Sequence, residues 1–131
     1  HLGIKISYKV QKKPSGIPEA FILGKEFIKN NKVCLILGDN FFYNLKLNIN
    51  QIMKKYQNLI ILKKVKNPEK YGVVKILNNK IQKIIEKPKK KLSNLAVTGI
   101  YFFDKYAYKN TKLLKPSKRK ETEIVDLIKI Y

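Results

Sequence analysis

Asp39 is the residue whose type and setting point most directly to chemistry, because it follows the apolar run 34–37 in the sequence CLILGDN. In α/β proteins, ligands collect in the crevice outside the carboxyl ends of the strands. Gly38 allows a close approach of the backbone, and a carboxylate there can hold Mg²⁺, which takes few protein ligands and leaves its other positions to phosphates and water. A turn aspartate that caps the next element would look the same in sequence. Both roles for Asp39 therefore stay open at this level.

Two further pairs of residues carry groups that fit a sugar phosphate. Tyr71 precedes Gly72, so the ring can form the floor under a sugar while the glycine amide donates to a hydroxyl. Glu86 precedes Lys87, which combines a carboxylate for hydroxyls with an ammonium for phosphate, and Pro88 is expected to keep Lys87 extended. The alternatives are a tyrosine packed beside a loop glycine and a surface ion pair of little energetic weight.

The loop QKKPSG contains a third candidate, Gln11, together with Gly16. The side-chain amide of Gln11 both donates and accepts, so it can pair with the edge of a base. The six glycines of the chain are scattered, and no Gly-rich phosphate loop occurs in it. One histidine and one cysteine cannot make a zinc site of the usual kind, so a metal would be a hard cation on oxygen ligands.

The net charge of +20 comes almost wholly from lysine, since Arg119 is the single arginine. Specific nucleic-acid readers favour arginine, so this composition indicates a solvated surface rather than a nucleic-acid partner, although a positive field would attract a small polyphosphate. No apolar stretch is long enough for a membrane span, and Cys34 alone cannot form a disulfide framework. We expect a cytoplasmic protein with neither a nucleic-acid nor a membrane partner.

The elements that position these residues can be predicted from hydrophobic spacing. Residues 4–10 alternate in polarity like a strand, apolar residues recur at helical spacing from 17 to 28, and 33–37 is typical of a strand buried on both faces. A strand, a helix and a strand in this order predict a right-handed βαβ unit with parallel strands. The length of 131 residues is that of a single domain.

The second half of the chain is predicted to contain mostly strands. Asn78-Asn79 is a favourable tight turn, so 73–77 and 80–86 are expected to form a hairpin, and Asp104 is expected to cap a short helix. The other expected elements are a helix at 49–56, strands at 59–65 and 95–103, and a final helix that begins at Glu121.

Six segments, taken in order, resemble the glucose-1-phosphate thymidylyltransferases, a branch of the sugar nucleotidyltransferase family. The segments are QKKPSGIPEAFILGKEFI, LILGDNFFYN, VKNPEKYGVVKI, IIEKP, LAVTGIYFFD and KPSKRKETEIVDLIKIY. The resemblance implies a Rossmann-like α/β/α core with a mixed, mostly parallel sheet. It also implies Mg²⁺-dependent conversion of dTTP and glucose 1-phosphate to dTDP-glucose and pyrophosphate, a step of deoxysugar and surface polysaccharide biosynthesis.

The same resemblance implies roles for nine residues. These roles are thymine recognition by Gln11 and Gly16, Mg²⁺ binding by Asp39, glucose binding by Tyr71, Gly72, Glu86, Val97 and Tyr101, and phosphate binding by Lys87. The chemistry needs no protein nucleophile, because positioning and charge neutralisation at the transferred phosphoryl group suffice.

Two parts of the family pattern have no counterpart in the 131 residues: the N-terminal Gly-rich phosphate loop and the later segment with a second metal-binding aspartate. We therefore expect residues 1–131 to be a partial nucleotidyltransferase domain, incomplete at both ends and inactive alone, from a protein that forms a homotetramer or dimer. The alternatives are a relative that uses another nucleotide, a regulatory domain that binds a sugar nucleotide, and a basic nucleic-acid-binding domain.

Overall fold

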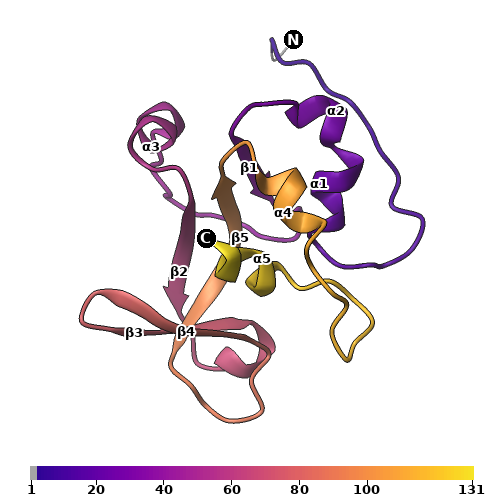
Figure 1. Cartoon of the computed structure of the whole chain (residues 1–131). Coiled ribbons are helices and arrows are strands. Elements are labelled where there is room, and N and C mark those ends of the chain that lie inside the picture. Colours follow the sequence, from indigo (N-terminus) through magenta and orange to yellow (C-terminus); the bar gives the residue numbers. More distant parts are fainter. Residues whose placement is uncertain (1–2) are drawn as a thin grey trace.

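The computed structural model of the chain describes residues 3–131 as a mixed α/β fold with a five-stranded sheet (Figure 1). The strands are β1 (Val33–Ile36), β2 (Leu59–Lys64), β3 (Gly72–Leu77), β4 (Lys80–Glu86) and β5 (Leu95–Phe103). The helices are α1 (Glu19–Leu23), α2 (Lys25–Ile28), α3 (Ile49–Lys55), α4 (Ala107–Thr111) and α5 (Ile124–Ile130), with a short 3-10 helix η1 (Pro68–Lys70). The predicted α/β class is confirmed.

The central strand of the sheet is β5, with which three other strands pair. β2 pairs with β5 between residues 95 and 102, whereas β1 pairs with residues 100–103 and β3 with residues 95–96. Because β2 overlaps both of these stretches, β1 and β3 must lie on the opposite edge of β5. Within the described part of the chain, residues 97–99 therefore have no strand beside them on that edge, which leaves a gap between β1 and β3.

The strands β3 and β4 form the predicted hairpin. Asn78 and Asn79 have φ values of 50° and 58°, as a tight hairpin turn of this kind requires. The register shifts by one residue between Lys75 and Ile76, because β4 carries an extra residue, Gln82, at that point. Beyond this bulge Gly72 lies opposite Glu86.

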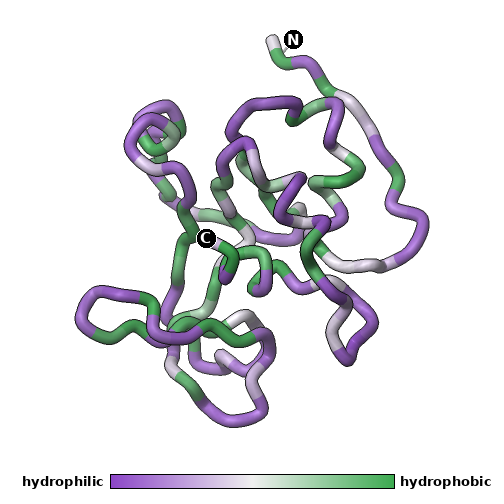
Figure 2. Tube along the Cα trace, viewed as in Figure 1, coloured by the Kyte–Doolittle hydropathy of each residue, from purple (hydrophilic) through white to green (hydrophobic). Residues whose placement is uncertain are grey.

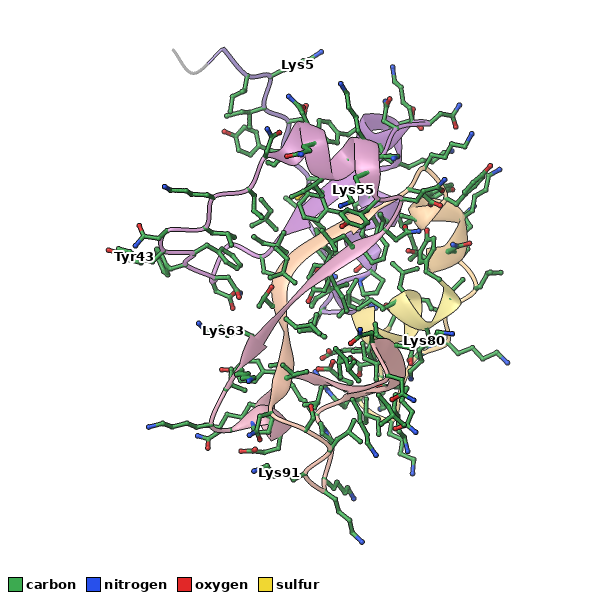
Figure 3. The ribbon with its side chains drawn as sticks, turned by 90° about the vertical axis from the view of Figure 1, so that its left-hand side faces the viewer. Lys5, Tyr43, Lys55, Lys63, Lys80 and Lys91 are labelled. Atoms are coloured by element: carbon green, nitrogen blue, oxygen red, sulfur yellow. The ribbon has the colours of Figure 1, made fainter. Side chains whose placement is uncertain are left out.

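The hydrophobic core lies between the sheet and the helices α1, α4 and α5. Phe21 and Phe103 are each 1% exposed and meet edge to face with ring centroids 5.4 Å apart. Ala107 and Leu127 add small and large buried side chains from α4 and α5. Figure 2 shows the apolar residues gathered along the strands and α5, with polar residues on the outer turns. By contrast, α3 has no buried residue.

The predicted first strand and the predicted parallel pairing are wrong. Residues 4–10 form neither a helix nor a strand and are exposed, and every strand pairing among the described residues is antiparallel. An alternating sequence becomes a strand only where a neighbouring strand satisfies its backbone groups. The predicted neighbour of residues 4–10 is β1, but β1 pairs with β5 instead. β1 is also only partly buried, so the prediction that it is covered on both faces is wrong.

Two helices also differ in detail from their predictions. The helix expected between 17 and 28 divides at Gly24, which ends α1 and begins α2. The final helix begins at Ile124, with Glu123 as its extended N-terminal flank, because residues 117–121 are taken up by a turn in which the amide of Ser117 donates to the Glu121 carbonyl. The helix α3 agrees with its prediction. Asp104 does not cap α4, whose N-cap is Tyr106 without a side-chain cap bond, but its carboxylate accepts from the Tyr106 amide just before the helix.

Across residues 3–131, none of the helices combines the length and the apolar character that crossing a bilayer demands.

Candidate functional site

The candidate site is a cleft of about 370 Å³ at the gap between β1 and β3. One loop and three strands reach it: the loop after β1, the start of β3, the end of β4, and residues 97–99 of β5, which among the described residues have no strand beside them on this edge. Arg119 and residues 121–125, which lead into α5 and include its first two residues, close its remaining side. Seven of the nine predicted site residues line it, namely Asp39, Tyr71, Gly72, Glu86, Lys87, Val97 and Tyr101.

The hairpin explains why two distant sequence pairs meet in the cleft. Gly72 lies opposite Glu86, and the Lys87 amide donates to the Tyr71 carbonyl at 3.0 Å. Gly72 is packed tightly, since a Cβ there would lie 2.8 Å from Val125 Cγ1 and 3.2 Å from a Glu86 carboxylate oxygen. The pair Tyr71-Gly72 and the pair Glu86-Lys87 therefore face one ligand space together.

Lys87 does not have the extended conformation that the following proline predicts. Its φ is 41°, in the left-handed region that residues other than glycine rarely adopt. Backbone strain of this kind costs on the order of 1–3 kcal/mol and concentrates at functional positions. The exposed ammonium group of Lys87 thus sits on a strained link between β4 and the loop that follows.

Asp39 lies in an exposed turn at the mouth of the cleft. Its carboxylate accepts a 2.7 Å hydrogen bond from the Asn40 side chain. It does not cap the next helix: that role belongs to Asn48, whose side chain accepts from the Gln51 amide. No group of three histidine, cysteine or acidic side chains in the described chain could hold a metal. One carboxylate at a solvent-open cleft fits Mg²⁺, which is bound through one or two carboxylates and substrate phosphates.

Arg119, Glu121 and Glu123 also line the cleft, although the sequence did not predict them as site residues. Arg119 Nη2 lies 2.9 Å from the Glu121 carboxylate, and its Nη1 lies 3.8 Å from both Glu86 and Glu123. Glu123 also accepts a 2.7 Å bond from the Ser117 hydroxyl. The single arginine thus balances three carboxylates. Arg119, Glu121 and Glu123 lie in the segment KPSKRKETE, whose sequence predicts only an irregular basic connection. Their role depends on the fold, which places Arg119 beside Glu86 at the end of β4.

The electrostatics of the cleft follow from burial and these carboxylates. Burial raises the pKa of Glu86, the charge of Glu123 raises it further, and Lys87 and Arg119 oppose the rise. Burial, with smaller contributions from the charges of Glu86 and Asp39, raises the pKa of Tyr101 to about 12. The Tyr101 phenol therefore stays neutral and can donate a hydrogen bond at any ordinary pH.

Gln11 and Gly16 are not among the residues that line the cleft. The Gln11 amide donates to the Gly16 carbonyl and to the Glu19 carboxylate. Gly16 has a φ of 105° and lies so close to the Thr122 backbone that no side chain would fit. The neighbouring Ser15 carbonyl accepts from both the amide and the hydroxyl of Thr122, at 2.8 and 2.9 Å. This loop is thus tied to a residue that does line the cleft.

The sequence profile of the nucleotidyl transferase family matches residues 1–131, and the chain belongs to that family. The resemblance predicted from the sequence is thereby confirmed. The chain is 46% identical over 135 residues to the glucose-1-phosphate thymidylyltransferase of Neisseria meningitidis serogroup A / serotype 4A, a match that covers 98% of this chain and 46% of that protein. It is 38% identical over 136 residues to the protein of the same name from Mycobacterium tuberculosis strain H37Rv, covering 100% and 46%.

Solved structures agree with this assignment. A crystal structure of a Bacillus anthracis protein assigned as a glucose-1-phosphate thymidylyltransferase, in complex with sucrose, matches with a TM-score of 0.86 at 40% identity, over 98% of this chain and 53% of that one. A UDP-glucose pyrophosphorylase complexed with UDP-glucose matches with a TM-score of 0.81 at 27% identity, over 95% and 53%. The chain therefore spans about half the length of the relatives that it matches.

Proposed function

We propose that this chain forms the sugar-phosphate-binding part of a glucose-1-phosphate thymidylyltransferase, which makes dTDP-glucose and pyrophosphate from dTTP and glucose 1-phosphate. The observation that carries the proposal is the convergence of Asp39, Tyr71, Gly72, Glu86 and Lys87 on one cleft. Similarity along the whole chain to proteins named for that activity supports it.

The proposed sugar site uses both ends of the β3–β4 hairpin. Tyr71, which is 47% exposed, offers its ring as a floor for glucose, and the Glu86 carboxylate accepts from sugar hydroxyls. Val97 and Tyr101 form the wall on the β5 side. Lys87, at the rim, supplies the positive charge for the phosphate.

The proposed reaction needs these groups for positioning only. An oxygen of the sugar phosphate forms a bond to the α-phosphorus of dTTP, the bond from that phosphorus to the bridging oxygen breaks, and pyrophosphate leaves. Lys87 would hold the attacking phosphate, and Glu86 and Tyr71 would hold the sugar so that the attack is in line. Mg²⁺, which Asp39 would help to hold, supplies neutralisation of phosphate charge when bound.

Gln11 and Gly16 are proposed to recognise thymine from the loop beside the cleft. Their bond to each other and the tie of Ser15 to Thr122 support a fixed position for this loop next to the sugar site. The higher identity to the thymidylyltransferase structure than to the UDP-glucose pyrophosphorylase, 40% against 27%, favours dTTP over UTP. We further propose a cytoplasmic homo-oligomer, a tetramer or dimer, that serves deoxysugar and surface polysaccharide synthesis.

A titration of the 131-residue chain with glucose 1-phosphate, followed through its backbone amide NMR signals, tests the sugar site. We expect shifts at Tyr71, Gly72 and Lys87, and weaker binding in Lys87→Ala. Lys89→Ala is the matched control, because Lys89 is an exposed lysine outside the cleft. Shifts confined to other parts of the chain, or equal effects of the two substitutions, would reject the proposed site.

The activity of the chain is tested by pyrophosphate release from dTTP and glucose 1-phosphate in the presence of Mg²⁺. We expect no turnover by the 131 residues alone, because they contain no Gly-rich loop for the nucleotide phosphates and span about half of each relative. Clear turnover by the chain would contradict this expectation.

A further inference from the structure

We propose that Asn40 is a positioning residue, which fixes the Asp39 carboxylate to the open edge of β5 and so presents it for cation binding. This inference rests on the proposed Mg²⁺ role of Asp39. Asn40 is only partly exposed, although it follows an exposed aspartate. Both polar atoms of its side chain form hydrogen bonds, since Oδ1 accepts one and Nδ2 donates one. The neighbouring Phe41 is 90% exposed and takes no part in the contact.

The carbonyl end of the Asn40 side chain continues the edge of the sheet. The ladder between β1 and β5 ends at Ile36 opposite Ile100, and the Leu37 amide then donates to the Gly99 carbonyl at 2.9 Å. The next free group on this edge is the Gly99 amide, which donates to Asn40 Oδ1 at 3.3 Å. The side chain of Asn40 therefore takes the place of a strand backbone in the gap between β1 and β3.

The amide end of the same side chain holds Asp39. Asn40 Nδ2 donates to Asp39 Oδ1 at 2.7 Å, while the Asn40 amide donates to the Leu37 carbonyl and closes the turn. A donor on one carboxylate oxygen restricts the rotation of the group about its own side-chain bonds. Asp39 thus receives a fixed direction from β5 although it lies in an exposed loop, where a free carboxylate would sample several rotamers.

Gly99 is the other half of this contact. A Cβ at Gly99 would lie 2.7 Å from the Asn40 side-chain carbon, closer than real Cβ atoms approach other atoms. Alanine at this position would therefore displace Asn40 and release Asp39 without changing either residue. Asn40→Ala and Gly99→Ala are two independent ways to break the same contact.

The test uses Mn²⁺ as a paramagnetic probe and the amide NMR signals of the 131-residue chain, so that it needs no catalytic activity. In the unmodified chain, we expect Mn²⁺ to broaden the signals of Gly38, Asp39 and Asn40. Because Asp39 loses its fixed direction in Asn40→Ala and in Gly99→Ala, the Mn²⁺ concentration at half effect is expected to rise about 3- to 10-fold in each, which corresponds to about 0.7–1.4 kcal/mol.

Two further variants sharpen the result. Asn50→Ala removes the same amide group from an exposed site in α3 and is expected to leave the Mn²⁺ titration unchanged. The double variant Asn40→Ala/Gly99→Ala is expected to bind no more weakly than Asn40→Ala, because both changes act through one contact. The amide signals of α5, which lies far from Asn40 in the sequence, report whether each variant is folded.

The outcomes separate this inference from the function on which it rests. Broadening at Asp39 that weakens in both single variants supports the role of Asn40. Broadening at Asp39 that is the same in every folded variant overturns the role of Asn40 and leaves the cation site standing. Absence of broadening at Asp39 in the unmodified chain overturns the cation site, and the role of Asn40 with it.

Discussion

Replacing Gly72 by alanine is expected to destabilise the chain, because it forces a methyl group into the contact between β3 and α5. The new Cβ would lie 2.8 Å from Val125 Cγ1, where unstrained carbon atoms stay about 3.5–4.0 Å apart. Val125 is 1% exposed and cannot move into solvent, so the helix or the strand must give way. Overpacking of this kind costs about 1–3 kcal/mol of the free energy of unfolding. Urea unfolding followed by circular dichroism measures it.

A second substitution identifies the cause of this loss. Val125→Ala removes Cγ1 and is expected to cost about 2 kcal/mol alone, as two buried methyl groups and a small cavity would. If the clash is with Val125, the double variant Gly72→Ala/Val125→Ala loses at least about 1 kcal/mol less than the sum of the single variants.

The control for this experiment is Gly38→Ala, since a Cβ at Gly38 meets no atom within 4 Å. It is expected to change the free energy of unfolding by no more than about 0.5 kcal/mol, or to stabilise slightly through the unfolded chain. Strict additivity in the double variant, or equal losses in Gly72→Ala and Gly38→Ala, would refute the packing argument.

Three other predictions concern the charged groups of the cleft. Because burial raises the pKa of Glu86 above 4.5, its contribution to stability is full below that pH and is lost as the pH rises through the folded pKa. Glu86→Gln is therefore expected to flatten that part of the pH dependence of urea unfolding, and an unchanged slope would contradict it. Arg119→Met is expected to raise the pKa of Glu86 further, and a carbon NMR titration that finds it unmoved would show that Arg119 does not act on Glu86. Lys87→Gly is expected to be about 1 kcal/mol more stable than Lys87→Ala, because Lys87 has a φ of 41°, while both weaken glucose 1-phosphate binding equally; a more stable alanine variant in urea would count against strain at this residue.

Much of the site could be predicted because its parts are local in sequence. An aspartate after an apolar run and the hairpin turn at Asn78-Asn79 have direct physical signatures: Asp39 lines the cleft, and the turn forms at the predicted residues. The hairpin also implies that residues near 72 and 86 approach each other. The meeting of Asp39 with this pair depends on how β1 and β3 share one edge of β5, and no local pattern encodes that arrangement.

The parts that escaped prediction depend on long-range partners. Residues 4–10 have the alternation of a strand, but a strand forms only beside another, and the described structure has none next to this segment. Arg119 lies in a lysine-rich stretch and differs from its neighbours only through the three carboxylates that the fold brings to it. Pro88 favours an extended conformation for Lys87, but Lys87 has a left-handed backbone. The surrounding structure must therefore outweigh this local preference.

The extra residue in β4 shifts its pairing with β3 by one position. This shift determines which side chains of β4 face the cleft and which face the core. A regular ladder from Asn78-Asn79 would pair Gly72 with Ile85 and would turn Lys83 toward the buried Val74. With Gln82 inserted, Ile84 enters the core instead. The one inserted residue thus determines that Glu86, and not Ile85, lies opposite Gly72 at the site. Insertions or deletions near the hairpin tip should be tolerated when they keep β4 and β3 in this phase, and should abolish the sugar site when they change it by one.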